Sequence, residues 1–336
     1  MNVAKDIAQV ARKQGHTPVC LDYLANAEDV RRMCDAAVIV MTFNPMLARS
    51  WFMLYRELKR RGVPAVFYTT TEGRLPRRYV LPWMKRDLEV VANSLYTKSK
   101  IEEVGVAVID VVLHGFSPED VEVALKYRNA VRRELESKVG KGVIIGVVAS
   151  GHPRKGHKFF GEVVRLVRQE VKEALFYIIT TPAAATFYMG TDGVFVDTDF
   201  GNRGKSETLA YIAAFDFLAH PSLAEGFGLP VLEANALGVP AIHLAYPPLV
   251  EFSDPKLNYW VNYKQLIFDS FGEGIDYELH LYDPTEFAKA IVDAVKFKLD
   301  APDEYEARRE ELRKAVAKYS IYELYPKLLS YIKLVY

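Results

Sequence analysis

Residues 224–240 have the sequence AEGFGLPVLEANALGVP, a glycine-containing loop that leads into a helix. Gly226 and Gly228 permit positive φ and a close approach of the backbone to a ligand, and Pro230 suits the first turn of a helix. The free N–H groups at such a helix start favour an anion. Because Glu225 and Glu233 flank this turn, we expect both carboxylates to border the same pocket.

The composition indicates a two-domain globular protein. The chain has 336 residues, half of them hydrophobic, which is enough for two cores. Lys plus Arg and Asp plus Glu each number 43, so no overall charge attracts nucleic acid, and nucleic acid is not expected as the main partner. The only cysteines, Cys20 and Cys34, form neither a disulfide framework nor a zinc motif, which favours a reducing cytoplasm.

The sequence constrains membrane contact, heat adaptation and oligomeric state less strongly. No apolar run approaches the roughly 18 residues of a membrane-spanning helix, so only a peripheral membrane contact stays open. Scarce glutamine and abundant Tyr, Arg and Glu are compatible with a heat-adapted source. A homodimer is neither indicated nor excluded.

Apolar strand-like runs alternate with amphipathic helices, which predicts an α/β fold with doubly wound parallel sheets. The expected strands are 17–23, 36–43, 63–70, 89–93, 106–113, 142–149, 175–180, 193–197, 215–219 and 241–245. The expected helices are 3–15, 48–61, 97–104, 118–138, 207–214, 230–237, 284–299 and 305–319, with one more after residue 156. Residues 253–282 are expected to form a packed aromatic insertion.

This series of elements predicts two Rossmann-like domains. The N-terminal domain comprises residues 1–114 and would lie on the acceptor side, and the C-terminal domain comprises residues 115–319. The terminal segment 320–336 is expected to pack back on the N-terminal domain.

A second loop, SGHPRKG at 150–156, also follows a predicted strand. Arg154 and Lys155 beside glycines at a helix start suit a phosphate or diphosphate. Ligands in open α/β sheets bind at the carboxyl ends of strands, so we expect this loop to face the loop at 225–230. One loop carries cations and the other carries carboxylates, and together they suit a nucleotide sugar. Alone, the basic residues would fit a solvated turn equally well.

The combined motifs resemble a known family. The run HPSLAEGFGLP at 220–230, with Glu233 completing an E-x7-E pattern, resembles the signature of retaining glycosyltransferases of family 4, the "glycosyl transferases group 1". Asp216, the basic motif at 154–156 and the run PLVE at 248–251 match the same pattern. The resemblance spans roughly residues 105–320 and implies the GT-B fold, two Rossmann-like domains facing across a cleft. Because the chain starts almost directly in a helix, we expect either a shortened N-terminal domain or one whose first strand is missing.

The resemblance also implies roles for individual residues. The donor diphosphate would meet Lys155 and Arg154, the ribose hydroxyls would meet Glu233, and the transferred sugar would lie beside Glu225. Where the family commonly has a histidine near the reacting sugar, this chain has Glu72 as the nearest ionisable group. The implied donor-binding residues are Gly151, Arg154, Lys155, Val196, Glu225, Gly226, Phe227, Gly228, Leu229 and Glu233, and the implied catalytic residues are Glu225, Lys155 and Glu72.

The implied activity is transfer of a hexose from a nucleotide diphosphate sugar, such as a UDP- or GDP-hexose, to an acceptor hydroxyl with retention of anomeric configuration. No further cofactor is expected. The acceptor would be a glycan, a lipid-linked sugar or a protein. The alternatives are a catalytically inactive nucleotide-sugar-binding partner subunit, or a GT-B-type epimerase or phosphorylase.

Two further motifs have competing interpretations. Asp197-Thr198-Asp199 fits the D-x-D metal pattern, but Arg154 and Lys155 can neutralise a diphosphate without a cation, so we predict no metal and place this motif in a loop near the base. The basic-aromatic segment Arg74–Arg86 suits a phosphorylated or lipid-linked acceptor, a membrane surface or nucleic acid, or else forms a solvated loop.

Overall fold

The computed structural model describes residues 2–332, so Met1 and residues 333–336 of the predicted terminal segment lie outside the described residues. Its N-terminal part contains α1 (Asn2–Lys13), α2 (Ala27–Met33), β1 (Ala37–Thr42), α3 (Arg49–Arg60), β2 (Ala65–Thr70), β3 (Gly73–Arg74), the 3₁₀ helix η1 (Arg77–Tyr79), α4 (Pro82–Asp87), β4 (Val90–Ala92), α5 (Leu95–Glu102) and β5 (Val108–Val111). Strands β1, β2, β4 and β5 form a parallel sheet in the order β1-β2-β4-β5.

The C-terminal part begins with the long helix α6 and contains the larger sheet. Its elements are α6 (Pro118–Val139), β6 (Val143–Val148), η2 (Pro153–Lys155), α7 (His157–Glu170), β7 (Ala174–Ile179), α8 (Pro182–Ala185), η3 (Thr186–Tyr188), β8 (Val194–Asp197), α9 (Lys205–Ala214), β9 (Phe217–His220), α10 (Leu229–Ala236), β10 (Ala241–Leu244), η4 (Leu249–Glu251), β11 (Tyr259–Val261), β12 (Gln265–Asp269), β13 (Asp276–Leu281), α11 (Pro284–Asp300), α12 (Pro302–Val316), η5 (Ala317–Tyr319) and α13 (Ile321–Ser330). Six parallel strands pair in the order β11-β10-β9-β6-β7-β8.

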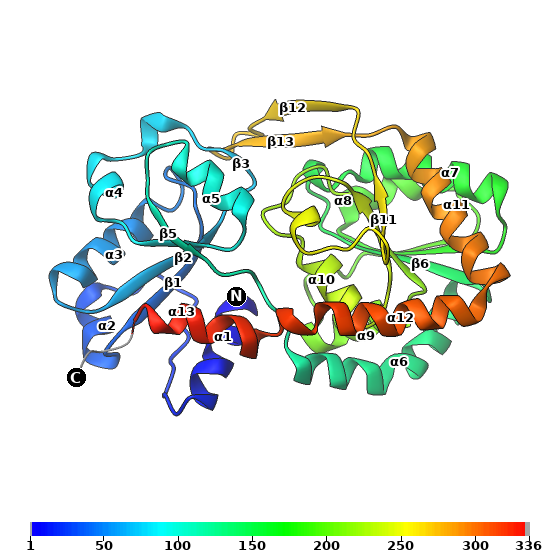
Figure 1. The fold of residues 1–336 in the computed structure, drawn as a ribbon. Helices are drawn as coiled ribbons and strands as arrows, with labels where there is room; N and C mark the ends of the chain where they lie inside the picture. Colours follow the sequence, from blue (N-terminus) through cyan, green and yellow to red (C-terminus); the bar gives the residue numbers. More distant parts are fainter. Residues whose placement is uncertain (1, 333–336) are drawn as a thin grey trace.

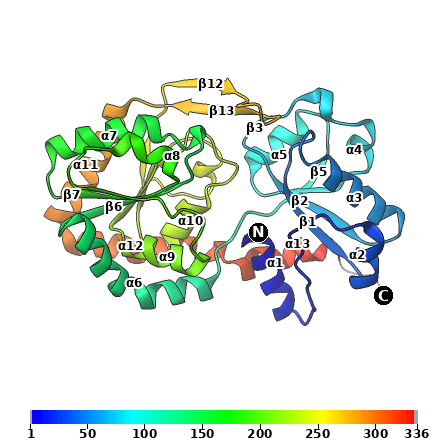
Figure 2. The ribbon, with the colours of Figure 1, turned by 180° about the vertical axis from the view of Figure 1, so that it is seen from behind.

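The two parallel sheets lie in two bodies joined side by side, which confirms the predicted α/β class (Figure 1). Every residue of β6 and β7 is buried, as expected for continuous apolar runs covered on both faces. Helices α7 and α8 lie on one side of the larger sheet and α6 and α9 on the other, in both views (Figures 1 and 2). Ser117 caps the start of α6 by accepting from Asp120 N, and Gly140 ends the helix at φ 95°.

The predicted strand at 17–23 is wrong. The segment between α1 and α2 has no regular secondary structure and is mostly exposed, with Val19 at 52% and Tyr23 at 58% of full exposure. Edge strand β1 pairs with β2 on one side, and this segment supplies no partner for its other side. Its short alternation of apolar residues was therefore a misleading signal, because a strand is stable only when its backbone groups pair.

Residues 253–282 are not a simple packed insertion. They form β11 at the edge of the larger sheet, followed by the antiparallel hairpin β12–β13, which reaches across to β3 of the N-terminal part. At this crossing a Cβ on Gly73 would lie 2.0 Å from the carbonyl oxygen of Asp276, so only glycine allows the two backbones to pair. The hairpin spans the two bodies along one edge of the molecule (Figures 1 and 2).

A second connection lies along the opposite edge. Helix α13 continues from α12 towards the N-terminal sheet and runs beside α1 (Figure 1). Ile321, Tyr325 and Leu328 of α13 share a hydrophobic cluster with Ile7 of α1 and Val66 of β2. The two bodies are thus connected at both edges, which holds the loops between them in register. Within residues 2–332, no helix is both long enough and apolar enough to cross a membrane.

Candidate active site

The two glycine-containing loops meet because their strands are neighbours. Strand β6 leads into the loop at 149–156, β9 leads into the loop at 221–228, and β6 and β9 pair directly. Leu223 N donates to Arg154 O at 2.7 Å, which confirms the expected contact between the loops. Gly156 has φ 75°, and a Cβ there would lie 2.2 Å from Pro221 O. The basic loop therefore depends on glycine both for its conformation and for this close approach.

We expect Gly156→Ala to destabilise the fold through both effects, by several kcal/mol, because the left-handed conformation alone costs roughly 1–2 kcal/mol and a backbone oxygen cannot move aside easily. Gly190 is a matched control, since it has φ 73° with no atom within 4 Å of an added Cβ. Gly190→Ala should lower the melting temperature less, and the difference between the variants measures the contact with Pro221. Equal melting temperatures for the two variants would contradict this account.

Four side chains form an ion-pair network where the loops meet, here called the charge network: Arg154, Lys155, Glu225 and Glu72. Lys155 Nζ lies 2.5 Å from Glu225 Oε1, and Arg154 lies 3.6 Å from Glu225 Oε2. Arg154 also reaches Glu72 at 2.8 Å, which joins the C-terminal part to the loop after β2. The structure thus brings together the three residues predicted to be catalytic, Glu225, Lys155 and Glu72.

The charge network determines the ionisation of its carboxylates. Burial acts to raise the pKa of Glu225, but Lys155, His220 and Arg154 outweigh it and hold that pKa well below its ordinary value. His220 Nε2 lies 3.0 Å from Glu225 Oε1. Burial raises the pKa of Glu72, with Arg154 opposing the shift and Glu225 adding to it. Glu225 is therefore a permanent anion at neutral pH, whereas Glu72 takes up a proton more readily.

The loop at 226–229 presents main-chain groups rather than side chains. Phe227 is 4% exposed and stacks on Phe252 at 4.7 Å between ring centroids, so its side chain belongs to the core. Among residues 2–332, the N–H groups of Phe227, Gly228 and Leu229 donate no hydrogen bond. They stand at the start of α10, where such groups favour an anion. Asn93 of the N-terminal part donates to Gly226 O at 3.2 Å and anchors the loop from the other side.

A cavity of about 550 Å³ is lined by Val148, where β6 leads into the basic loop, and by Glu233. Its floor follows the carboxyl ends of β6 and β7 at Val148 and Ile179, where ligands of open α/β sheets bind. Helix α1 of the N-terminal part contributes Lys5, Asp6 and Gln9 to the lining. The lining residues are Lys5, Asp6, Gln9, Asp120, Val148, Ile179, Asp199, Phe200, Gly201, Arg203, Gly204, Lys205, Thr208, Leu209 and Glu233.

Glu233 lies in a strongly acidic part of this cavity. Lys205 pairs with Asp6 at 2.8 Å and with Asp120 at 3.2 Å, and no ion pair of Glu233 is formed within the described residues. Burial raises the pKa of Glu233 to about 7; Lys205 opposes this rise, and Asp6 and Asp120 add to it. Glu233 is thus a carboxyl group that changes charge near neutral pH and faces an open cavity.

Several predicted site residues lie elsewhere than expected. Glu225 is held in the charge network and does not line the cavity of Glu233, so the expectation of one shared pocket is not met in this arrangement. The N–H of Gly151 donates to Thr181 Oγ1 at 3.0 Å. Val196 lies within β8, and the loop that follows, 199–201, lines the cavity instead.

The D-x-D motif is likewise placed differently. Asp197 ends β8 rather than lying in a loop, and it pairs with Arg203 at 2.7 Å and accepts from Tyr177 Oη at 3.0 Å. Among the residues that the structure describes, no group of three or more His, Cys, Asp or Glu side chains is arranged to hold a metal ion. Metal independence stays a prediction.

Residues that the sequence pattern missed come mainly from α1 and the start of α9. Asp6, Lys205 and Arg203 line the cavity, and Arg203 Nη1 is buried without a hydrogen-bond partner in the described part of the chain. Nothing in the local sequence marks Asp6, because its contact with Lys205 spans 199 positions. Arg203 could have been predicted as a site residue, because it is a cation that follows a strand and lies close to the D-x-D motif in the sequence.

The C-terminal part matches a known family. Residues 142–296 match the family model described as Glycosyl transferases group 1. This segment contains both glycine-containing loops, the charge network residues Arg154, Lys155 and Glu225, and Glu233. Residues 142–296 are thus similar to group 1 glycosyltransferases. The narrower assignment to family 4 and the E-x7-E role of Glu225 and Glu233 stay predictions.

Two further comparisons extend the similarity over 98% of the chain. The chain is 24% identical over 337 residues to "Uncharacterized glycosyltransferase 335" of Sulfolobus islandicus rod-shaped virus 1, covering 98% of this chain and 96% of that protein. A glycosyltransferase structure from Rickettsia africae ESF-5 superposes with a TM-score of 0.69 at 15% identity, covering 98% of this chain and 93% of the other.

A second solved structure supports the same fold. An α,α-trehalose-phosphate synthase (UDP-forming) from Burkholderia xenovorans, in complex with glucose-6-phosphate, superposes with a TM-score of 0.65 at 11% identity, covering 91% of this chain and 75% of that one. These likenesses show that the two parallel sheets are arranged in the GT-B fold.

Proposed function

We propose that this protein is a retaining glycosyltransferase that moves a hexose from a nucleotide diphosphate sugar to an acceptor hydroxyl without a metal ion. The observation that carries the proposal is the joining of Arg154, Lys155 and Glu225 at the ends of β6 and β9, together with a cavity at the end of β6 that contains Glu233. Cations and free N–H groups suit a diphosphate, and carboxylates suit sugar hydroxyls.

In this proposal the cavity of Glu233 holds the nucleoside part of the donor. A volume of about 550 Å³ falls within the roughly 300–1,000 Å³ of small-molecule sites. Phe200 and Leu209 supply apolar walls for a base, and Glu233 accepts hydrogen bonds from the ribose hydroxyls. Arg203 supplies a further donor to the same ligand through its unpartnered Nη1.

The diphosphate would become the new partner of Arg154 and Lys155. Both cations are held by Glu225 and Glu72, so donor binding exchanges one set of anions for another without leaving a buried cation unpaired. As the bond to the sugar breaks, negative charge grows on the leaving phosphate, and fixed cations at that point lower the barrier. No protein nucleophile is needed, because the leaving phosphate takes the proton of the acceptor hydroxyl. Glu72, on the acceptor side, would orient that hydroxyl.

The test is a thermal-shift panel of UDP-, GDP- and ADP-hexoses, followed by transfer with a radiolabelled donor. A ligand at about a hundred times its dissociation constant should stabilise the fold by roughly 2.7 kcal/mol. Since one structural neighbour was solved with glucose-6-phosphate, a sugar phosphate is the first acceptor to add. Retained configuration in the product and full activity in EDTA are expected.

The same experiment separates the alternatives. Donor binding with neither transfer nor hydrolysis would favour an inactive partner subunit, and an epimerised sugar or a sugar phosphate would favour an epimerase or phosphorylase. Activity lost in EDTA and restored by manganese would contradict metal independence. The absence of any stabilisation by nucleotide sugars would contradict the proposed function itself.

A further inference from the structure

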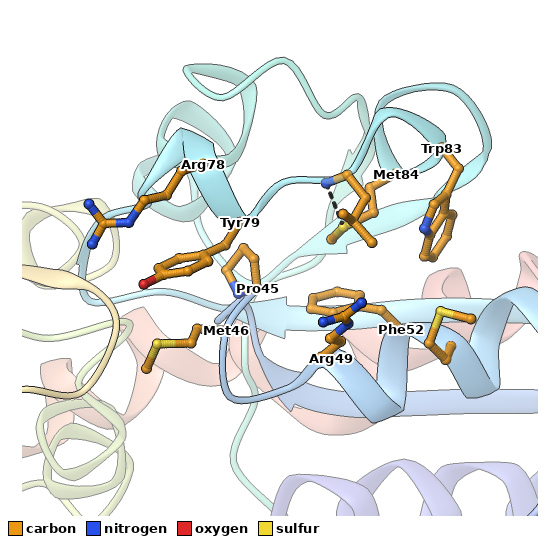
Figure 3. A pocket seen from close by; sticks show the side chains of 10 residues that line it. Pro45, Met46, Arg49, Phe52, Arg78, Tyr79, Trp83 and Met84 are labelled. Carbon is orange, nitrogen blue, oxygen red and sulfur yellow. Dashed lines mark hydrogen bonds between the residues drawn. The ribbon is translucent and has the colours of Figure 1, made fainter.

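A second cavity lies in the N-terminal part, away from the charge network. It has a volume of about 220 Å³ and lies between the α3 side (residues 45–53) and the η1–α4 side (residues 78–84). In Figure 3, Tyr79, Met84 and Trp83 stand on one side of the opening and Met46, Arg49 and Phe52 on the other. Apart from Arg49 and Arg78, every lining residue is apolar or aromatic. We call this space the arginine-rimmed pocket.

The two arginines at the rim have no acidic partner. Neither Arg49 nor Arg78 forms an ion pair within residues 2–332, although both are exposed at the mouth of an apolar space. Arg60 of α3, by contrast, pairs with Glu57. Two unpaired cations beside an apolar cavity are complementary to a molecule with an anionic end and a hydrocarbon end.

Trp83 adds a polar group that lacks a partner inside the pocket. Its side chain is buried at 7% exposure, and within the described residues its indole Nε1 has no hydrogen-bond acceptor. Figure 3 shows the nitrogen edge of the indole turned towards the space between Met84 and Phe52. A buried N–H without an acceptor is unfavourable, so an ester oxygen that joins a hydrocarbon chain to its anionic group would be stabilised there.

One end of the arginine-rimmed pocket points towards the C-terminal part. Met46 lies against the turn of the β12–β13 hairpin, since a Cβ on Gly274 would be 2.5 Å from Met46 Cε. The same turn is fixed to the N-terminal part by Asn44 Nδ2, which donates to Glu273 O at 2.7 Å. It also reaches the basic loop, because His152 Nε2 lies 3.1 Å from Glu273 Oε1. The pocket is therefore linked through this turn to the loop of Arg154 and Lys155.

We propose that the arginine-rimmed pocket binds the chain of an alkyl or isoprenoid phosphate, with the phosphate held by Arg49 and Arg78. Resting on the proposed function, this identifies the acceptor class as a lipid-linked sugar, in which the phosphate joins the chain to the sugar that supplies the acceptor hydroxyl. About 220 Å³ is below the roughly 300 Å³ of sites that enclose a whole small ligand, so the pocket takes only the part of the chain next to the phosphate. A nucleic acid fits less well, because the apolar lining offers it neither an open stacking face nor a basic groove.

The test measures binding of monomeric alkyl phosphates to the full chain without any donor, by isothermal titration and by tryptophan fluorescence. Butyl, hexyl, octyl and decyl phosphate form a series in which each methylene that enters the pocket should tighten binding about fourfold, from about 0.8 kcal/mol per methylene. The gain should stop once the pocket is filled. Inorganic phosphate and an uncharged alkyl maltoside should bind at least tenfold more weakly than octyl phosphate.

Arg49→Glu and Arg78→Glu should each weaken octyl phosphate binding about tenfold or more. Arg60→Glu is the matched control, since it makes the same charge change at an exposed position of α3 that already pairs with Glu57, and it should change binding less than twofold. Trp83→Phe removes the indole N–H and keeps an aromatic side chain, and it should weaken octyl phosphate binding. Melting temperatures of the variants show that each is folded.

Four results would overturn the proposal. Alkyl phosphates that bind without chain-length dependence, or equally well to Arg49→Glu and Arg78→Glu, would exclude the pocket as the site. Binding only to anionic phospholipid vesicles would indicate a membrane surface instead, and binding only to oligonucleotides would indicate nucleic acid. Nucleotide-sugar binding is measured separately, so a failure here leaves the proposed function standing.

Discussion

Lys155→Ala is expected to lower kcat/KM for hexose transfer by about 10²–10³-fold, the typical cost of removing one fixed donor to a developing anion. Lys155 is the cation closest to Glu225 at the meeting point of the two loops, and its charge would move from that carboxylate to the leaving diphosphate. Most of the loss should appear in kcat, since the interaction strengthens as the phosphate departs. Steady-state transfer with a labelled donor measures both constants.

Lys158→Ala is the matched control for this variant. Lys158 lies in α7, three positions after Lys155, and is exposed. Its removal should therefore change kcat/KM less than twofold. If Lys155→Ala fails to fold because Glu225 loses its buried partner, Lys155→Met combined with Glu225→Gln removes both charges together and keeps the experiment decisive. Wild-type turnover in either variant would exclude Lys155 from the reaction.

Glu233→Gln is expected to weaken donor binding about 10- to 100-fold and to abolish its pH dependence. With its pKa raised to about 7 by burial, Glu233 is mostly protonated at pH 6 and mostly ionised at pH 8. The carboxylate accepts two ribose hydroxyls better than the acid does, so the donor should bind up to about tenfold more tightly at pH 8 than at pH 6. Titration calorimetry at the two pH values measures this ratio, and a wild-type ratio in Glu233→Gln would refute the assignment.

Although Glu233→Gln should weaken donor binding, it should stabilise the fold at pH 8. The pKa of Glu233 is higher in the folded protein than its ordinary value of 4.5, so between these values the folded state holds a proton that the unfolded state has lost. The free energy of unfolding therefore falls as pH rises from about 4.5 to about 7. Glu233→Gln avoids that loss, and its melting temperature should exceed that of the wild type by a few degrees at pH 8 but not at pH 4. Equal differences at both pH values would contradict the shifted pKa.

The sequence predicted most of the strands and helices that build the two sheets. Strands such as β6 and β7 are continuous apolar runs of the correct length, and α6 and α11 carry caps and prolines at their starts. The prediction failed for residues 17–23 and missed the β12–β13 hairpin. In both places the outcome depended on whether a partner strand was present, and a local pattern does not contain that information.

The residues of the candidate site likewise fall into two groups, those that a local sequence pattern predicts and those that only folding brings together. Arg154, Lys155 and Glu225 were recognisable because glycines and prolines at fixed spacing mark loops that follow strands. Asp6 and Lys205 were not, because their ion pair joins α1 to the start of α9. The pocket rimmed by Arg49 and Arg78 also lay beyond prediction, although the basic-aromatic segment that forms one side of it stood out.

The sequence by itself determined the α/β class, the two loops with their charges and the resemblance to group 1 glycosyltransferases, because each depends on residues close together in the chain. Only the tertiary structure decided which charges are paired and which face open space. Arg154 and Lys155 turned out to be held by Glu225 and Glu72, whereas Glu233 faces a cavity without an ion-pair partner in the described residues. The physical reason is that desolvation and Coulomb energy depend on distance in space, which folding sets and sequence separation does not.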